Sequence, residues 1–254
     1  MSMYMITFSP TGGTNKVAEA LAHSLFADYQ TIDLADSKLD FSSYSFTADD
    51  VCLIAAPVFG GRIPKTAAER LAQMQAQNTR AVLAAVYGNR AFEDALVEMQ
   101  DIAERIGMVP IAGVAAIAEH SIARTIAAAR PNDADMQQLK QFAQMIAPKL
   151  HEPLPSQKLQ LPGNHPYRDY SKSALVPSVK DTCSKCGICA AHCPVNAISA
   201  DDPTQTDASK CIACMRCIAV CPDHERFLPA PVLDAMTAKL SFLCPEPKQN
   251  ECFL

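Results

Sequence analysis

The chain has 254 residues, more than one typical domain needs, so two domains or one large domain are expected. Hydrophobic residues make up 49% and charged residues 19%, which is enough apolar material for a core and excludes a mainly disordered chain. Lys and Arg number 22 against 27 Asp and Glu, a formal charge of −5. This balance argues against nucleic acid as an obligate partner, because phosphate binding needs a basic field.

The start of the chain, Met1 to Phe8, lacks the basic residues, long apolar stretch and small-residue cleavage site of a signal peptide. No run reaches the roughly 18 apolar residues of a membrane span. A cytoplasmic protein without a membrane span is therefore expected. In that setting clustered cysteines more often bind metal or react than form disulfides.

Residues 1–150 alternate short apolar runs with longer amphipathic ones, which predicts a doubly wound α/β domain with a parallel sheet. The runs that predict buried strands are Tyr4–Phe8, Val51–Phe59, Ala81–Tyr87 and Val109–Ile117. Apolar residues at spacings of three and four predict two helices, one over Phe92, Leu96, Met99, Ala103 and Ile106 and one over Met136, Leu139, Phe142, Ile146 and Leu150. Ligands of such sheets bind at the carboxyl ends of the strands.

The first strand ends in a loop of small hydroxyl residues and glycines, Ser9-Pro10-Thr11-Gly12-Gly13-Thr14-Asn15, and an apolar-faced helix follows. Backbone amides, hydroxyls and the helix dipole make such a loop an anion site that suits a phosphate monoester. The loop lacks both the Gly-Lys-Ser/Thr ending of a Walker loop and the Gly-x-Gly-x-x-Gly of dinucleotide folds, which disfavours nucleoside triphosphates and NAD. The simpler alternative is that the glycines only turn the chain.

The pattern Ser9-x-Thr11-Gly12-x-Thr14 resembles the phosphate loop of flavodoxins, which hold FMN. Two later loops, Pro57-Val58-Phe59-Gly60-Gly61-Arg62 and Tyr87-Gly88-Asn89-Arg90, follow the third and fourth strands, where the flavodoxin family clasps the isoalloxazine ring. The resemblance implies a five-stranded flavodoxin-like sheet and FMN held by Ser9, Thr11, Gly12, Gly13, Thr14, Asn15 and the residues of those two loops.

The flavin loops depart from the family pattern in two ways. The chain has no Trp, so Phe59 or Tyr87 would have to stack on the ring, unless both belong only to the core. Arg62 and Arg90 would favour a reduced, anionic flavin by Coulomb attraction, unless they are solvated loop charges.

Residues 151–178 contain five prolines and Gly163, a composition that resists helix and central strand and predicts a linker or a wrapping segment. Ten of the eleven cysteines follow this segment. Eight of them form two copies of Cys-x-x-Cys-x-x-Cys-x-x-x-Cys-Pro, starting at Cys183 and Cys211 with a period of 28. Zinc is the alternative to iron–sulfur clusters for paired Cys-x-x-Cys motifs, although it would not need the third close cysteine or the following proline.

This repeat resembles the bacterial two-cluster ferredoxin, and residues 179–254 are expected to form a small α+β domain of that kind. The family exchanges the fourth cysteine of each run. The resemblance therefore implies two 4Fe–4S clusters, one held by Cys183, Cys186, Cys189 and Cys221 and the other by Cys211, Cys214, Cys217 and Cys193. His192 and His224 are expected at the surface, and no cluster is assigned to Cys52, Cys244 or Cys252.

The chain resembles flavodoxin–ferredoxin fusions of anaerobic and facultative bacteria over essentially its full length. A negatively charged cluster domain favours a redox protein partner, such as a ferredoxin, a reductase or an acceptor enzyme, with a basic docking face. Two functions stay open: an electron relay between clusters, FMN and a partner, or an FMN-dependent reductase of an organic molecule fed through its own ferredoxin domain. No residue is assigned a catalytic role; Arg62, Tyr87, Arg90 and Glu119-His120-Ser121 could line a substrate pocket, with His120 as a proton donor.

The tail predicts one more helix, over Val232–Leu243, after Pro229 and Pro231. Leu243, Phe253 and Leu254 are expected to dock the tail onto the first domain.

Overall fold

The computed structural model describes residues 2–170 and 175–254. Met1, the first residue of the segment compared with a signal peptide, and residues 171–174 of the predicted linker lie outside the described residues. Within the described part of the chain, no helix is both long enough and apolar enough to cross a membrane.

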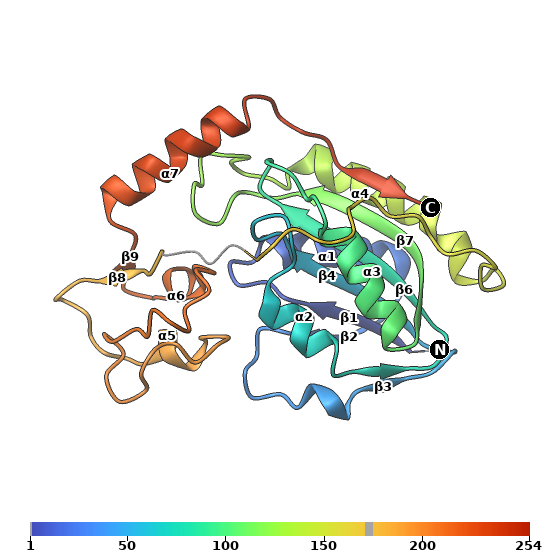
Figure 1. The fold of residues 1–254 in the computed structure, drawn as a ribbon, viewed down its shortest axis with the longest axis horizontal. Helices are drawn as coiled ribbons and strands as arrows, with labels where there is room; N and C mark the ends of the chain where they lie inside the picture. Colours follow the sequence, from blue (N-terminus) through green and yellow to red (C-terminus); the bar gives the residue numbers. More distant parts are fainter. Residues whose placement is uncertain (1, 171–174) are drawn as a thin grey trace.

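The larger part of the molecule is built on a sheet of five parallel strands (Figure 1). These strands are β1 (Met3–Thr7), β2 (Gln30–Asp33), β4 (Val51–Pro57), β6 (Thr79–Tyr87) and β7 (Met108–Ile117). Four of them lie within two residues of the predicted apolar runs, which are buried on both faces as parallel strands require. Their spatial order, β2-β1-β4-β6-β7, is the flavodoxin-like 2-1-3-4-5 order of the doubly wound fold.

Helices cover both faces of this sheet (Figure 1). On one face lie α1 (Gly13–Leu25) and α4 (Asp133–Ile146), whose buried apolar residues form one core cluster with the sheet. On the other face lie α2 (Lys65–Leu71) and α3 (Ala95–Arg105), which form the second core cluster. The two helices predicted from periodicity are thereby confirmed as α3 and α4, and α4 continues into a short 3-10 helix, η2 (Ala147–Leu150).

A small subdomain flanks the β2 edge. It consists of the 3-10 helix η1 (Phe41–Ser43) and a parallel pair of two-residue strands, β3 (Ser45–Phe46) and β5 (Gln75–Ala76). Phe41 and Phe46 are buried there and close the core between β2 and α2.

The cysteine repeat folds into a separate small lobe beside the carboxyl edge of the sheet (Figure 1). The lobe contains the antiparallel pair β8 (Ser178–Val179) and β9 (Arg226–Phe227) and two single-turn helices, α5 (Ile188–Ala191) and α6 (Arg216–Ala219). Each helix follows a residue with left-handed backbone, Gly187 at φ 78° and Met215 at φ 60°, so the sequence repeat is also a structural repeat.

Among the residues that the structure describes, three polar contacts join the lobe to the sheet domain. Arg70 donates to the carbonyl of Pro194 at 2.6 Å, Ser37 to Asn196 at 3.2 Å, and Arg216 lies 3.5 Å from the carboxylate of Asp33. Asp33 is the last residue of β2, so these contacts fix the lobe at the edge of the sheet where ligands of doubly wound folds bind.

The segment between the two domains runs along α3 rather than through solvent. Acidic residues of α3 and its N-cap hold it: Asp94 accepts hydrogen bonds from the backbone amides of Asn164 and Arg168, both at 2.9 Å, and Glu98 accepts one from the Tyr170 hydroxyl at 2.7 Å. Asp101 similarly accepts a hydrogen bond from the Tyr167 hydroxyl. Of the two predicted alternatives, linker or wrapping segment, the described part of this stretch is a wrapping segment.

After the lobe the chain returns to the sheet. Helix α7 (Ala230–Leu243) confirms the predicted tail helix, and β10 (Glu251–Phe253) then pairs antiparallel with β7 as a sixth strand that the sequence did not predict. Phe253 packs on the core as expected, and the half-exposed Leu254 lines a surface pocket with Pro110 and Ile111 of the first domain. Leu243 is 48% exposed, so its predicted docking is wrong. The last strand thus belongs to the first domain's sheet, although it was expected within the second domain.

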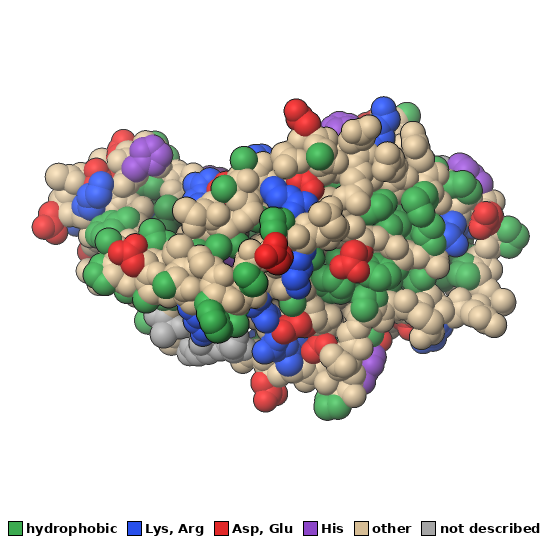
Figure 2. All heavy atoms as spheres, turned by 90° about the horizontal axis from the view of Figure 1, so that it is seen from above, with side chains coloured by type: hydrophobic (Ala, Val, Ile, Leu, Met, Phe, Trp, Pro, Cys, Tyr) green, Lys and Arg blue, Asp and Glu red, His purple; other side chains and the backbone are tan. Residues whose placement is uncertain are grey.

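Helix α7 packs on the rest of the molecule mainly through one buried side chain, Leu240. Its Leu240, with Cys244 just after it, packs against Ala123 and Ile126 of the loop after β7. Phe242 is 85% exposed. Figure 2 views this side of the molecule from above and shows hydrophobic side chains mixed with charged ones of both signs.

Candidate functional site

The loop between β1 and α1 has the geometry of an anion site. Gly12 adopts φ +90° and, as a glycine, offers no capping side chain, so the amides of Gly13 and Thr14 at the start of α1 are left for a ligand. Ser9 accepts a hydrogen bond from the backbone amide of Asn15 at 2.9 Å, which fixes the turn. The side-chain oxygen of Asn15 is buried without a hydrogen-bond partner, an orphaned polar group of the kind that a bound ligand satisfies.

A small cavity of about 50 Å³ opens above this loop. Its walls come from all three predicted flavin loops: Pro10, Thr11, Gly13 and Thr14; Pro57, Val58 and Phe59; Tyr87 and Gly88. The remaining lining residues are Val86, Ala118, Glu119, His120, Ser121 and Cys214. No Lys or Arg side chain lines it among the described residues, so a phosphate here would be held by amides and hydroxyls.

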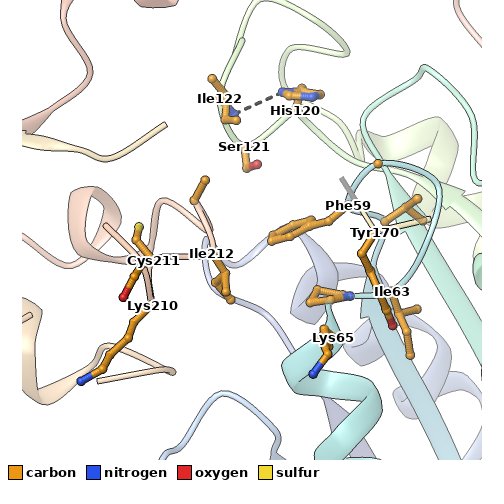
Figure 3. Close-up of a pocket in the computed structure, with 15 residues that line it drawn as sticks. Phe59, Ile63, Lys65, His120, Ser121, Ile122, Tyr170, Lys210, Cys211 and Ile212 are labelled. Atoms are coloured by element: carbon orange, nitrogen blue, oxygen red, sulfur yellow. Dashed lines mark hydrogen bonds between the residues drawn. The ribbon is translucent and has the colours of Figure 1, made fainter. Parts of the chain in front are cut away.

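A larger cavity of about 420 Å³ continues from the small one, with which it shares Val58, Phe59, His120 and Ser121. Figure 3 shows its two sides: Phe59, Ile63, Lys65 and Tyr170 face Lys210, Cys211 and Ile212 across the opening. Its volume lies in the range of small-molecule and cofactor sites. No sequence pattern pointed to five of the lining residues, because they come from distant segments of the chain and meet only when the lobe docks. These are Ile63, Lys65, Tyr170, Lys210 and Ile212.

His120 closes the top of the larger cavity with a fixed ring (Figure 3). Its Nδ1 accepts hydrogen bonds from the backbone amides of Ile122 at 3.2 Å and Ala123 at 3.1 Å, which leaves the proton of the neutral ring on Nε2. Burial lowers the pKa of the imidazole below its ordinary value. A Cβ added at Gly88 would lie 2.5 to 2.9 Å from three carbons of His120, so the glycine makes room for the ring.

The two arginines predicted near the flavin are held elsewhere. Arg62 forms an ion pair with Glu98, and Arg90 pairs with Glu93, both at 2.7 Å. Among the described residues, neither guanidinium lines either cavity. Each one turns instead toward its carboxylate, Glu98 within α3 or Glu93 just before that helix. The expected positive field at the flavin is therefore not formed by these side chains.

Five further residues of the predicted cofactor set belong to these loops but line neither cavity. Asn89 bonds to the backbone of Glu246 and Lys248 in the returning tail, at 3.0 and 2.8 Å. Gly61 packs against Glu93 and Arg168. The others are Ser9, Gly12 and Asn15 of the first loop.

The eight cysteines of the repeat surround two small cavities in the lobe. One is lined by Cys183, Cys186, Cys189 and Cys221, and the other by Cys193, Cys211, Cys214 and Cys217. The structure thus brings the cysteines together in the two crossed sets that the family resemblance implies. We refer to the first as the distal set and to the second as the proximal set, because only the second includes residues that line the cavities beside the flavin loops.

The thiols of the proximal set influence one another. Burial raises the pKa of Cys214 to about 12, and the nearby thiols of Cys217, Cys193 and Cys211 add to this rise. Burial likewise raises the pKa of Cys217 to about 11. Among the described residues, no group of three or more His, Cys, Asp or Glu side chains could hold a single metal ion as they stand, and the cysteines surround cavities instead.

The three remaining cysteines lie apart from both sets. Cys52 is buried in β4, and Cys252 is in β10. Cys244 directly follows α7 and packs with Leu240 and Ile126. His192 and His224 are exposed at the surface of the lobe, as expected.

Comparison with known proteins identifies the second domain. Residues 176–222 match a protein-family model described as a 4Fe-4S dicluster domain. This match supports iron–sulfur clusters over the zinc alternative for the paired motifs.

The first domain is similar to solved structures of several flavoproteins. A Streptococcus pneumoniae TIGR4 flavodoxin is 18% identical, with 59% of this chain and 99% of that one covered and a TM-score of 0.42. A flavodoxin from the domain Archaea is 20% identical, covers 60% and 100%, and has a TM-score of 0.40. The apo form of an NADH:FMN oxidoreductase is 19% identical, covers 61% and 91%, and has a TM-score of 0.42.

At these identities the assignment of the first domain depends on its strand order. The order β2-β1-β4-β6-β7, with the ligand-binding edge occupied by the three loops, is that of the flavodoxin-like fold. The chain therefore joins a flavodoxin-like α/β domain to a 4Fe–4S dicluster domain.

Proposed function

We propose that this protein is an electron-transfer flavo-iron–sulfur protein that holds FMN at the carboxyl edge of the sheet and two 4Fe–4S clusters in the small lobe. One observation carries the proposal: Cys214 of the proximal set lines the same cavity as Thr11, Gly13 and Thr14 of the phosphate loop. A cofactor bound by that loop and a cluster bound by that cysteine would share a wall. FMN would supply one- and two-electron chemistry, and each cluster one-electron chemistry.

The residues of the flavin site fit a flavin phosphate and ring. The backbone amides of Gly13 and Thr14 and the hydroxyls of Thr11 and Thr14 provide donors for a phosphate, and Gly12 provides the turn that brings them together. The larger cavity provides apolar surface for a ring, with Phe59 as the side chain that projects into it (Figure 3). The neutral His120 presents its Nε2 proton as a hydrogen-bond donor at the junction of the two cavities.

The lobe fits two clusters. Each crossed set offers four thiols around one cavity, and the proline after each fourth cysteine, Pro194 or Pro222, lines a cavity as well. In this proposal the cysteines that line the distal cavity ligate one cluster and those that line the proximal cavity ligate the other.

An anaerobic reductive titration tests the proposal after iron, sulfide and FMN have been assayed. About eight iron atoms and one FMN per chain are expected, together with electron transfer from the clusters to the flavin. The variant Thr11→Ala with Gly12→Val should weaken flavin retention, because it removes a donor and blocks the tight turn. Full flavin occupancy in that variant, or iron well below eight in the purified wild-type protein, would contradict the assignment.

The reductase of an organic molecule is the second candidate, and the large cavity favours it. The cavity opens between Lys65 of the sheet domain and Lys210 of the lobe, and both side chains line it. Apolar walls suit the body of an organic anion, and the cations at the opening are these two lysines, each of which also pairs with a carboxylate, Glu69 or Asp207. Turnover of such compounds by the reduced protein, with loss of turnover in Lys65→Glu and Lys210→Glu, would support this candidate over the relay.

A further inference from the structure

The two cysteine sets differ in their surroundings. The proximal set touches the sheet domain: Cys211 and Cys214 line the two cavities beside the flavin loops. The cavity of the distal set is lined only by residues between Cys183 and Arg226, all within the lobe. The two sets thus occupy different positions relative to the flavin loops, one facing inward and one facing away.

The hydrogen bonds and the ion pair between the two domains also lie near the proximal set and not near the distal set. Pro194, Asn196 and Arg216, which reach the sheet domain, each lie within three residues of a proximal cysteine. In the part of the chain that the structure describes, no hydrogen bond or ion pair joins residues 180–189 or 221–225 to the sheet domain. The loop of the distal set is open to solvent: Cys186 is exposed, and Ile188 beside it is 36% exposed.

The side chains around the distal set carry an excess of negative charge. Among the described residues around it, Lys180 pairs with Glu225 at 3.6 Å and Lys185 with Asp202 at 3.3 Å. The buried Arg226 lines the distal cavity and donates to Thr206 and to the carbonyl of Pro203. Asp181, Asp201 and Asp223 are exposed carboxylates, and none of the three forms an ion pair among the described residues. Four thiolates also outweigh the positive charge of the cluster core that they hold.

We infer that an external one-electron carrier protein with a basic surface docks on this distal face, which we define as the Cys183–Cys189 loop with Asp181, Asp201 and Asp223. The inference rests on the proposed function and adds the place of exchange: electrons cross between the partner and the distal set, and between the flavin and the proximal set. Each exchange moves one electron. The carrier loses one electron when the lobe gains one, and it gains one electron when the lobe loses one. Opposite charge accelerates the encounter and makes it sensitive to salt.

A charge-reversal experiment tests the docking face on the complete holoprotein. The double variant Asp181→Lys with Asp201→Lys changes the distal face, and neither residue is a cysteine ligand or lines a cavity. The matched control is Asp28→Lys with Asp49→Lys, which makes the same change in net charge. Both control residues are exposed and lie just before β2 and β4, at the amino edge of the sheet opposite the lobe.

The probe is a basic c-type cytochrome, whose ferric haem takes one electron from the chemically reduced protein. Stopped-flow spectroscopy gives the second-order rate constant at low and high ionic strength. We expect the distal variant to lower this constant about tenfold or more at low ionic strength, because steering changes on-rates by factors of about 10 to 1,000. The control should stay within about twofold, and the difference should disappear near 1 M salt, where the Debye length is about 3 Å.

A second readout does not depend on electron transfer. Isothermal titration calorimetry with both proteins oxidised should show weaker binding of the cytochrome to the distal variant than to the control. Equal losses in the two variants, or an unchanged distal variant, would overturn the docking face. Failure of the proposed function looks different, because it would appear as missing iron or FMN in the wild-type protein before any partner is added.

Discussion

Arg62 and Glu98 form a buried two-bonded ion pair, with Nε to Oε2 at 2.8 Å and a terminal nitrogen to Oε1 at 2.7 Å. The side chains are only 11% and 3% exposed. The guanidinium also lies against the rings of Tyr167 and Tyr170, at 4.4 and 4.1 Å from their centroids. One residue of a predicted flavin loop therefore fastens that loop to α3 and to the wrapping segment at once.

Removal of one partner of this pair should be costly. Arg62→Ala leaves the Glu98 carboxylate buried without its cation, and we expect the free energy of unfolding to fall by about 3 to 5 kcal/mol. Arg90→Ala is the matched control, because its pair with Glu93 has side chains 31% and 27% exposed and should contribute about 1 kcal/mol or less. Urea denaturation followed by circular dichroism measures both. Equal losses would show that the burial of the pair has no energetic consequence.

The wrapping segment should loosen in acid. Burial alone would raise the pKa of Asp94, but the hydrogen bonds from Arg168 and Asn164 outweigh it and hold the pKa below its ordinary value. A lowered carboxylate pKa gives stability that is present above about pH 3.9 and is lost as the pH falls through the folded-state pKa. Hydrogen exchange at residues 160–170, corrected for intrinsic rates, should increase below about pH 4. Asp94→Asn should abolish this pH step, and a step that persists would assign it to another group.

The neutral state of His120 gives a second pH dependence. Burial lowers the pKa of His120 in the folded protein below that in the unfolded chain, about 6.5. As the pH falls, the unfolded chain therefore binds the proton first, and the contribution of the neutral ring to stability is lost as the pH falls from about 6.5 through the folded-state pKa. Protonation would also break the two hydrogen bonds that Nδ1 accepts. We expect the free energy of unfolding to fall in this window for the wild-type protein and to fall less for His120→Gln. Parallel curves for the two proteins would refute the role of this ring.

Iron content distinguishes ligand cysteines from structural ones. Cys214→Ala should lower iron from about eight atoms per chain to about four, or collapse the lobe, because cluster binding is part of its folding free energy. Cys244→Ala removes a thiol that lies outside both sets and should leave the iron content unchanged. Iron and sulfide assays on the anaerobically purified variants provide the measurement. Full iron in Cys214→Ala would refute its place in the proximal set.

The returning tail should stabilise the sheet domain. Asn250 is 4% exposed; it accepts a hydrogen bond from the Ile117 amide at 2.8 Å and donates one to Asp135 at 2.9 Å. Asn250→Ala leaves these buried groups without partners and should cost about 1 to 3 kcal/mol. Gln249→Ala, the exposed neighbour, should cost little. Thermal unfolding of both variants tests the prediction, and equal melting temperatures would contradict it.

Short sequence patterns predicted those features of the fold that depend on residues close together in the chain. The buried apolar runs of the parallel strands, the periodicity of α3 and α4, and the spacing of the cysteine repeat each depend on neighbours within a few residues. The pairing of β10 with β7 could not be foreseen, because Glu251–Phe253 is a three-residue strand without apolar alternation and its partner lies far back in the chain. The same limit applies to Arg62, whose partner Glu98 lies on the next helix but one.

The sequence by itself determined the two-domain architecture, the three loops that line the cavity at the carboxyl edge of the sheet, and the eight cysteines of the lobe. Strand burial, tight glycine turns and cysteine spacing each depend on a short segment of the chain. Only the tertiary structure decided which cysteines meet the flavin loops and where the loop arginines point. Those outcomes depend on how the lobe docks at Asp33 and Arg70, how the wrapping segment binds α3, and how the tail returns to β7. Such contacts join segments from distant parts of the chain, and their geometry exists only in the folded molecule.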